Sequence, residues 1–378
     1  MQVYADNAAT TRMKPAAIQE MTEAMKETYG NPSGVYSIGR EAKEALESSR
    51  YMIAQNIGAK TNEIFFTSGG SESNTQAILS AAAIGAGEQK THVITTTIEH
   101  DSVLNTMRQL QVMRFDVTIL DVDENGYIDP VKVHEAIRPN TALVSVMMAN
   151  NEIGTIQNIS QIGAICAIEG VLFHTDAVQA AGHLPIDVKD MNIDLLSMSS
   201  HKFGGPKGVG VLYAGSNVNL SPLILGGPQE RGKRAGTENV PGAVGMAAAL
   251  DDACENMEAN NAKITKLRDK LMDGLLAIPG TKLNGGKEPR LPGNVNVCFD
   301  GVESESLLVM LDEAGICASA GSACQAGSID PSHVLLAIGR TEQEAMHSLR
   351  LTLNEDNTEE EVDYLIEKIT ESVNKLRK

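Results

Sequence analysis

Tryptophan is absent from this chain of 378 residues, and aromatic residues make up only 3% of it. Long apolar runs are also missing, since none approaches the roughly 20 residues that a membrane-spanning helix needs. The first residues, MQVYADNAATT, lack the basic start and apolar core of a signal peptide. We therefore expect a cytoplasmic protein without a membrane segment.

Cysteine is scarce, and its five positions are scattered without the Cys-x-x-Cys spacing of zinc sites. This pattern favours neither a disulfide framework nor a resident metal. Basic residues are outnumbered, because 31 Lys and Arg face 49 Asp and Glu, which gives a net charge of −18. Such a chain repels phosphate backbones, so we expect no nucleic-acid partner.

Apolar runs alternate with helical patterns along the first two thirds of the chain. This alternation is typical of an α/β fold with a mostly parallel sheet between helices. The chain is longer than a single hydrophobic core usually supports. A long helix from about residue 241 to 277 is predicted to lead into a smaller α+β domain. We expect the large domain to span residues 15–247, and the small domain to combine residues 1–14 with 248–378.

The segment LLSMSSHKFGGPKGVGVLY, residues 195–213, is the most informative stretch. Two apolar runs flank a polar, glycine-rich turn, so a buried strand should end beside His201 and Lys202. A lysine that is desolvated at a strand end loses its proton readily and becomes a nucleophile, as a Schiff-base enzyme requires. From this stretch alone, a surface lysine in a turn remains the more common explanation.

A second strand end lies upstream, at Asp176. The apolar run Val171 to Phe173 leads directly to it, and strand ends are where an open α/β sheet places its ligand contacts. Pyridoxal phosphate (PLP) needs such a pair, because a lysine holds its aldehyde and an aspartate keeps its pyridine nitrogen protonated. Asp176 alone is more often a turn or capping residue, but together with Lys202 it favours a PLP site.

The segment FTSGGSESN, residues 66–74, predicts an anion site. An apolar strand breaks at Gly69 and Gly70, and Ser71 opens a helix whose first backbone N–H groups face the loop. The phosphate of PLP would fit there. A merely capped helix explains this segment equally well.

Cys324 lies in SAGSACQAGSID, a run of small residues before a predicted helix start. The loop, about residues 318–331, has few side chains to pack, so we expect an exposed and mobile thiol. The other four cysteines lie in apolar segments that favour burial. Since a partly ionised thiol is nucleophilic, Cys324 beside a PLP site suggests that it receives a group from a PLP-activated substrate.

Further motifs extend over nearly the whole chain, among them YADNAATT, TTIEHDSV, MANNEIGTIQ, FHTDAVQAAG, RAGTENV, GSACQAG and SLRLTLNEDNT. Together they resemble those of the PLP-dependent cysteine desulfurases of the nitrogen-fixation and iron–sulfur-cluster type. The resemblance implies PLP-dependent transferase fold type I, with a seven-stranded sheet, and a homodimer. It also implies that L-cysteine becomes L-alanine while Cys324 receives the sulfur as a persulfide. An acceptor protein, such as an iron–sulfur scaffold, would take this sulfur, and Cys324 would be a possible transient cluster ligand.

The resemblance also implies a role for each site residue. Lys202 would carry the Schiff base, with Asp176 at the pyridine nitrogen and His100 stacked on the ring, where it would move protons. Arg350 would bind the substrate carboxylate, since a guanidinium can donate two parallel hydrogen bonds. The phosphate would be bound by Gly70, Ser71, Ser199, His201 and, from the neighbouring subunit, Thr237; Asn151 and Gln179 would contact the ring hydroxyl, and Asn31 and Asn7 would line the substrate pocket.

Rival functions remain open at this stage. An aminotransferase or a selenocysteine lyase of the same fold would share Lys202 and Asp176, but an aminotransferase needs no thiol at Cys324. A catalytically silent scaffold protein would need none of these side chains. The intact set, which includes His100 and Arg350, favours the desulfurase.

Overall fold

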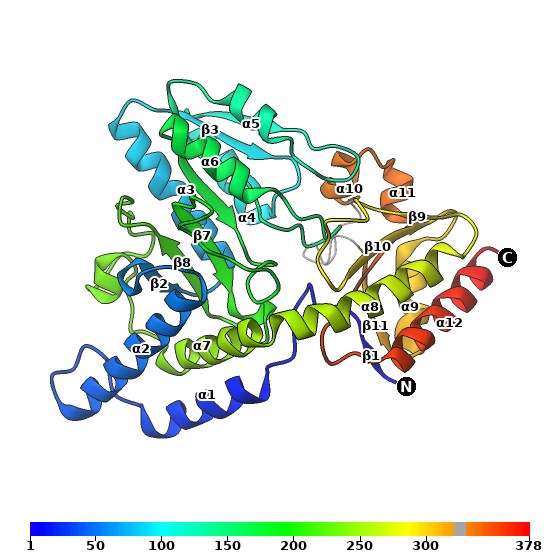
Figure 1. The fold of residues 1–378 in the computed structure, drawn as a ribbon, viewed down its shortest axis with the longest axis horizontal. Coiled ribbons are helices and arrows are strands. Elements are labelled where there is room, and N and C mark those ends of the chain that lie inside the picture. Colours follow the sequence, from blue (N-terminus) through cyan, green and yellow to red (C-terminus); the bar gives the residue numbers. More distant parts are fainter. Residues whose placement is uncertain (321–329) are drawn as a thin grey trace.

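The computed structural model describes residues 1–320 and 330–378, which form a larger and a smaller lobe (Figure 1). Helices α7 (Val240–Glu255) and α8 (Met257–Leu276) run nearly in line and lead from the larger lobe to the smaller one. Cys324 and most of the loop predicted at about 318–331 lie outside the described residues.

A seven-stranded sheet forms the centre of the larger lobe. Its strands are β2 (Ile64–Thr67), β3 (His92–Thr96), β4 (Asp116–Leu120), β5 (Thr141–Ser145), β6 (Leu172–Asp176), β7 (Leu195–Ser199) and β8 (Gly210–Ala214). They lie in the order β2-β8-β7-β6-β5-β3-β4. Strand β8 is antiparallel to both neighbours and the other pairs are parallel, so the predicted mostly parallel sheet is confirmed.

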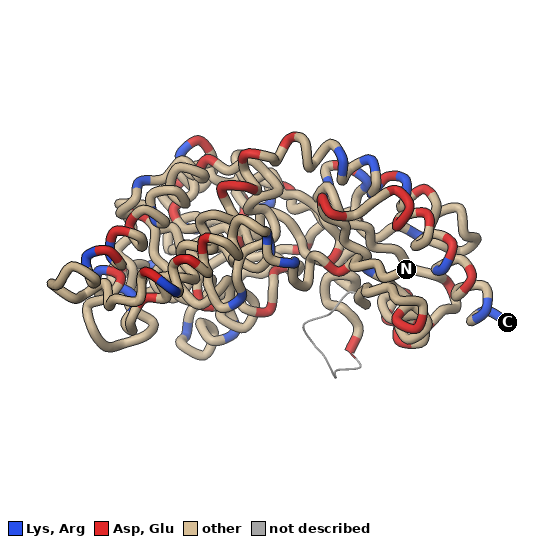
Figure 2. The backbone as a smooth tube through the Cα atoms, turned by 90° about the horizontal axis from the view of Figure 1, so that it is seen from below, with Lys and Arg blue, Asp and Glu red and all other residues tan. Residues whose placement is uncertain are grey.

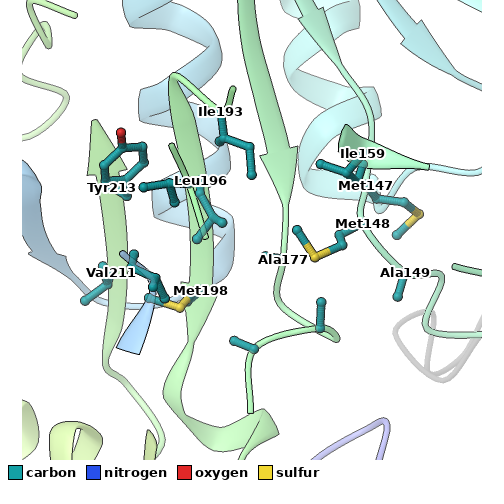
Figure 3. Close-up of a cluster of buried hydrophobic side chains, with 14 of the residues drawn as sticks. Met147, Met148, Ala149, Ile159, Ala177, Ile193, Leu196, Met198, Val211 and Tyr213 are labelled. Atoms are coloured by element: carbon teal, nitrogen blue, oxygen red, sulfur yellow. The ribbon is translucent and has the colours of Figure 1, made fainter. Parts of the chain in front are cut away.

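Helices cover both faces of this sheet. They are α1 (Pro15–Glu27), α2 (Ser37–Asn56), α3 (Gly70–Gly87), α4 (Asp101–Val112), α5 (Pro130–Ala136) and α6 (Ile159–Glu169). Successive strand residues point to opposite faces: Leu143 and Leu195 pack with α3 and α4, whereas Val144 and Leu196 pack with α2, α6 and α7. Figure 3 shows part of the second cluster around Leu196. Both faces are therefore covered by apolar side chains, and the polar residues within the strands, such as His174 and Ser197, are buried.

The smaller lobe holds two short sheets. In one, β1 (Val3–Tyr4) pairs in parallel with β11 (Ile316–Cys317). The other has the antiparallel order β12-β13-β10-β9, formed by β9 (Thr281–Leu283), β10 (Asn294–Phe299), β12 (Ser319–Ala320) and β13 (Ser348–Thr352). Helices α8, α9 (Ser304–Glu313) and α12 (Glu359–Leu376) pack around them, and α10 (His333–Ala337) and α11 (Glu342–Met346) are short.

The single helix predicted from about residue 241 to 277 is broken in the structure at Asn256, which ends α7 and precedes α8. The Asn256 amide donates to the carbonyl of Asp252, and such local bonding competes with helix continuation. Leu250 packs in the core of the larger lobe, whereas Ile264 packs in that of the smaller lobe. We therefore propose Asn256 as the domain boundary, in place of residue 247.

Charged residues of both signs are interspersed along the helices of both lobes, as Figure 2 shows. Within residues 1–320 and 330–378, no helix combines the length and the apolar character needed to cross a bilayer. The same described residues contain no group of three His, Cys, Asp or Glu side chains suited to a metal ion.

Candidate active site

A cavity of about 990 Å³ opens where β6 and β7 end and α3 and α4 begin. Ligand sites of open α/β sheets lie in this position because the parallel strands direct their carboxyl ends there. Ten of the residues that the sequence singles out line this cavity: Gly70, Ser71, His100, Asn151, Asp176, Gln179, Ser199, His201, Lys202 and Arg350.

Lys202 ends the 3₁₀ turn Ser200–Lys202 that follows β7. Its Nζ donates hydrogen bonds to the backbone carbonyls of Ala8, at 2.6 Å, and Ala9, at 2.8 Å. The Ala8 carbonyl also accepts a hydrogen bond from Nε2 of Gln179, at 2.9 Å. The amino-terminal segment is therefore part of the lysine site, which the sequence reasoning missed because these contacts use main-chain atoms.

Asp176 is the last residue of β6, and its side chain is buried. Oδ1 accepts a hydrogen bond from the backbone N–H of Val178 at 2.9 Å, and Oδ2 accepts one from Nδ2 of Asn74 at 2.6 Å. These two donors hold the carboxylate in a fixed orientation at the cavity wall. Asn74 was not predicted, although it lies one helical turn after Gly70 on α3, and this spacing places both residues on one helix face.

The beginning of α3 forms a close-packed cradle. A Cβ atom at Gly70 would lie 2.6 Å from Cγ2 of Val178, so only glycine fits against that side chain. The first N–H groups of α3, which lack partners within the helix, face the same cavity as Ser71 and Ser199. This part of the cavity suits an anion such as a phosphate.

His201 lies beside this cradle, and its Nδ1 is 3.1 Å from Oγ1 of Thr10. Burial, together with the positive charges of Lys202 and Lys207, lowers the pKa of His201 to about 4. The ring is therefore neutral at pH 7 and can donate one hydrogen bond without adding charge.

Arg350 reaches the cavity from β13 of the smaller lobe and is almost completely buried. Its Nη2 lies 2.9 Å from Oδ1 of Asp6, and its Nη1 donates to the carbonyl of Asn151 at 3.2 Å. Among residues 1–320 and 330–378, Nε meets no acceptor. A buried guanidinium with an unused donor is suited to bind an additional carboxylate.

His100 precedes α4 and caps it, because its Nδ1 accepts a hydrogen bond from the backbone N–H of Ser102 at 3.1 Å. The neighbouring Glu99 is fully buried, and its Oε1 accepts hydrogen bonds from Oγ1 of Thr96 and the N–H of Met147. Burial raises the pKa of Glu99 to about 8. Glu99 is therefore mostly protonated at pH 7 and adds little negative charge beside the cavity.

Three of the predicted residues within the described part of the chain lie elsewhere. Thr237 lines a cavity of about 60 Å³ that shares Ser68 and Gly208 with the large cavity. Asn7 lines one of about 40 Å³ that shares Ala8 and Gln179 with it. Asn31 is exposed and its Oδ1 accepts a hydrogen bond from the N–H of Ser33. Cys324 lies outside the described residues.

The side chains around the large cavity match the chemical parts of PLP. Lys202 supplies an amine for an aldehyde, and Asp176 supplies a carboxylate for a pyridine N–H. The cradle at Gly70 supplies N–H donors for a phosphate. The residues present therefore fit this cofactor.

Comparison with known proteins gives the same picture. The family described as class-V aminotransferases matches residues 3–365. Cysteine desulfurase IscS of Methanosarcina thermophila is 50% identical over 99% of this chain and 93% of its own length, and that of Clostridium botulinum is 50% identical over 100% and 95%. Among solved structures, a NifS-like protein with 38% identity superposes with a TM-score of 0.93 over 99% of this chain and 100% of its own. This chain therefore belongs to the class-V aminotransferase family and, within it, to the cysteine desulfurases.

Proposed function

We propose that this protein takes sulfur from L-cysteine, using PLP as cofactor, and places it on its own Cys324 for delivery to an acceptor protein. The observation that carries the proposal is the meeting of Lys202, Asp176 and Arg350 in one cavity. The class of substrate agrees with a solved relative, SspA in complex with cysteine, which is 39% identical with a TM-score of 0.82 over 94% of this chain and 100% of its own.

When bound, PLP supplies an electron sink for the substrate carbons. Lys202 would hold its aldehyde, Asp176 its pyridine nitrogen, and His100 the face of its ring. Its ring hydroxyl would contact Asn151 and Gln179, and its phosphate would bind Gly70, Ser71, Ser199 and His201. A neutral His201 fits this last role, because it can donate a hydrogen bond to the phosphate without placing a further positive charge beside Lys202 and Lys207.

Arg350 would bind the carboxylate of cysteine. The guanidinium is held by Asp6 and by the carbonyl of Asn151, so its orientation is set before the substrate arrives. Asn7 follows Asp6 in the chain, and its Nδ2 donates a hydrogen bond to the Thr352 carbonyl at 2.8 Å. It would border the substrate. Lys202, once released, would take the α-proton of the substrate as a general base.

The sulfur step balances without an external oxidant. The Cβ–S bond of cysteine breaks and an S–S bond forms with Sγ of Cys324, so that L-cysteine and a thiol become L-alanine and a persulfide. The substrate carbon is reduced as the transferred sulfur is oxidised, and the thiol proton is retained on the products. A thiolate at Cys324 is the nucleophile that this step needs.

The proposal includes a homodimer in the cytoplasm. The family resemblance assigns Thr237 to the phosphate of the neighbouring subunit, and in its own chain Thr237 lines the small cavity instead of the cavity of Lys202. Isologous dimers are also the commonest assemblies. The acceptor would be a protein such as an iron–sulfur scaffold, with Cys324 as the donor and as a possible transient cluster ligand.

Mass spectrometry after brief incubation with cysteine and PLP, alongside an alanine assay, tests this function. We expect added sulfur on the peptide that carries Cys324, together with alanine. Lys202→Ala should abolish alanine formation, and Cys324→Ser should bind cofactor but form no persulfide.

Cys254→Ser is the matched control, because burial raises the pKa of the Cys254 thiol to about 11 and so keeps it protonated. This variant should retain both products. Full rates of alanine and sulfide formation by Cys324→Ser would refute the proposal, and so would a cofactor-loaded protein that forms neither product from cysteine.

A further inference from the structure

A chain of hydrogen bonds joins Asp176 to His100 across the beginnings of α3 and α4. Nδ2 of Asn74 donates to Oδ2 of Asp176 at 2.6 Å and to Oγ of Ser102 at 2.9 Å. Oγ of Ser102 in turn lies 2.8 Å from Nδ1 of His100. All four residues line the same cavity, so the chain runs along the cavity wall.

The direction of each hydrogen bond follows from the chemistry of the groups. The backbone N–H of Ser102 can only donate, and it lies 3.1 Å from Nδ1 of His100, so Nδ1 is an acceptor. A carboxylate can only accept, so the amide nitrogen of Asn74 must face Asp176. Because Nδ1 already accepts from the Ser102 N–H and so carries no proton, the serine hydroxyl must donate to it, while its oxygen accepts from the same Asn74 nitrogen.

Two donors on Nδ1 determine the tautomer of His100. A neutral imidazole carries one proton, and that proton must then reside on Nε2. Protonation of Nδ1 would break the hydrogen bond from the backbone N–H of Ser102 and force the serine hydroxyl to change from donor to acceptor. It would also add a positive charge at the amino end of α4, where the helix dipole is already positive.

We propose that Asn74 and Ser102 are positioning residues. They fix His100 as its Nε2–H tautomer and hold its ring in a fixed position relative to Asp176. This inference rests on the proposed function, because it takes His100 and Asp176 as the residues beside the cofactor ring. Any proton that His100 exchanges in the reaction then passes at Nε2. Asn74 also ties the position of Asp176, and thus of the bound ring, to the orientation of His100.

The tautomer is tested by ¹⁵N NMR of histidine-labelled holoenzyme at neutral pH, without turnover. The chain has 8 histidines, so the His100 signals are identified by their loss in His100→Gln. We expect an unprotonated Nδ1 and a protonated Nε2. A proton on Nδ1, or rapid exchange between the two tautomers, would overturn the assignment.

The positioning role is tested by matched variants. Ser102→Ala removes the hydroxyl but keeps the backbone N–H, so it should preserve the tautomer and lower kcat/KM about fivefold, the equivalent of one hydrogen bond. Ser102→Thr restores the hydroxyl and should restore the rate. Equal losses in both variants, or no loss in Ser102→Ala, would refute the role.

A double-mutant cycle tests whether the two residues act as one chain. Asn74→Ala and Ser102→Ala should be non-additive in kcat/KM, because either change breaks the connection between Asp176 and His100. Strict additivity would refute the chain. If wild-type enzyme formed neither alanine nor persulfide, the proposed function would be refuted. The NMR experiment needs no turnover, so it would still decide the tautomer of His100.

Discussion

Oδ1 of Asp6 lies 2.9 Å from Nη2 of Arg350, so the arginine that we assign to the substrate carboxylate already has a carboxylate beside it. Asp6→Asn keeps the shape but removes the negative charge. We expect the free enzyme to lose about 2 kcal/mol in the free energy of unfolding, because the hydrogen bond from the buried Arg350 then has a neutral acceptor in place of a charged one. The KM for cysteine should fall severalfold, since the substrate then supplies the neutralising charge.

Steady-state kinetics and denaturant unfolding check this pair of effects. Asp312→Asn, an exposed change on α9, serves as the control and should alter neither quantity. A higher KM in Asp6→Asn would show that the orienting contact of Asp6 outweighs its competition with the substrate carboxylate.

Glu99 predicts an unusual dependence of stability on pH. Its pKa is raised by burial to about 8, so between about pH 4.5 and pH 8 the native state holds a proton that the unfolded state has lost. The contribution of Glu99 to stability therefore falls as the pH rises through this window. Glu99→Gln retains the acceptor for Thr96 and Met147 and cannot ionise.

Thermal unfolding of wild type and Glu99→Gln from pH 5 to pH 9 measures this effect. The variant should match wild type near pH 5 and exceed it at pH 8 by at least about 1 kcal/mol, the equivalent of one pKa unit. A difference that stays constant with pH would contradict the assignment of a protonated Glu99.

His174 should make the stability depend on pH in the opposite direction, so that stability is lost as the pH falls. It lies between Oγ of Ser145, at 2.8 Å, and Oγ of Ser197, at 3.0 Å, and burial lowers its pKa to about 3. Below about pH 6.5 the unfolded state thus binds a proton that the native state does not bind, so stability is lost as the pH falls from about 6.5 toward 3.

His174→Asn removes this penalty together with the packing of the ring. We expect it to cost about 1–3 kcal/mol at pH 7, where two serine hydroxyls lose their partner, and progressively less at lower pH. Chemical denaturation at pH 7 and pH 5 gives the two values. An equal cost at both would mean that His174 is charged in the folded protein.

Glu230 anchors the segment that carries Thr237. Its two carboxylate oxygens each lie 2.7 Å from a nitrogen of Arg50, and one also accepts a hydrogen bond from the N–H of Phe66. Both charged side chains are 2% exposed. Glu230→Ala leaves a buried cation without its partner and should cost about 3–5 kcal/mol.

The double variant Arg50→Met with Glu230→Leu separates charge from packing. It should recover most of the lost stability, because neither charge remains buried. Guanidinium unfolding of the two variants and wild type provides the comparison, and a double variant that is weaker than Glu230→Ala would exclude this account.

Local patterns were enough to predict much of the fold. Buried parallel strands read as apolar runs and helices as periodic ones, so strand ends at Asp176 and Ser199 could be found without a structure. The break at Asn256 could not, because a single asparagine is tolerated in many helices. Contacts such as Asp6 with Arg350, 344 residues apart, or Lys202 with the Ala8 carbonyl leave no local trace in the sequence.

The amino-terminal strand connects the start of the chain to its end. The Ala5 N–H donates to the Cys317 carbonyl, and the Ala5 carbonyl accepts from the N–H of Thr352. Three residues later, the Ala8 carbonyl accepts the hydrogen bond from Nζ of Lys202. The segment that holds the Lys202 amine is thus itself held by two strands of the smaller lobe. A lysine that belongs to the larger lobe therefore depends on the smaller lobe for its alignment, and a change that loosens the smaller lobe should also displace the amine.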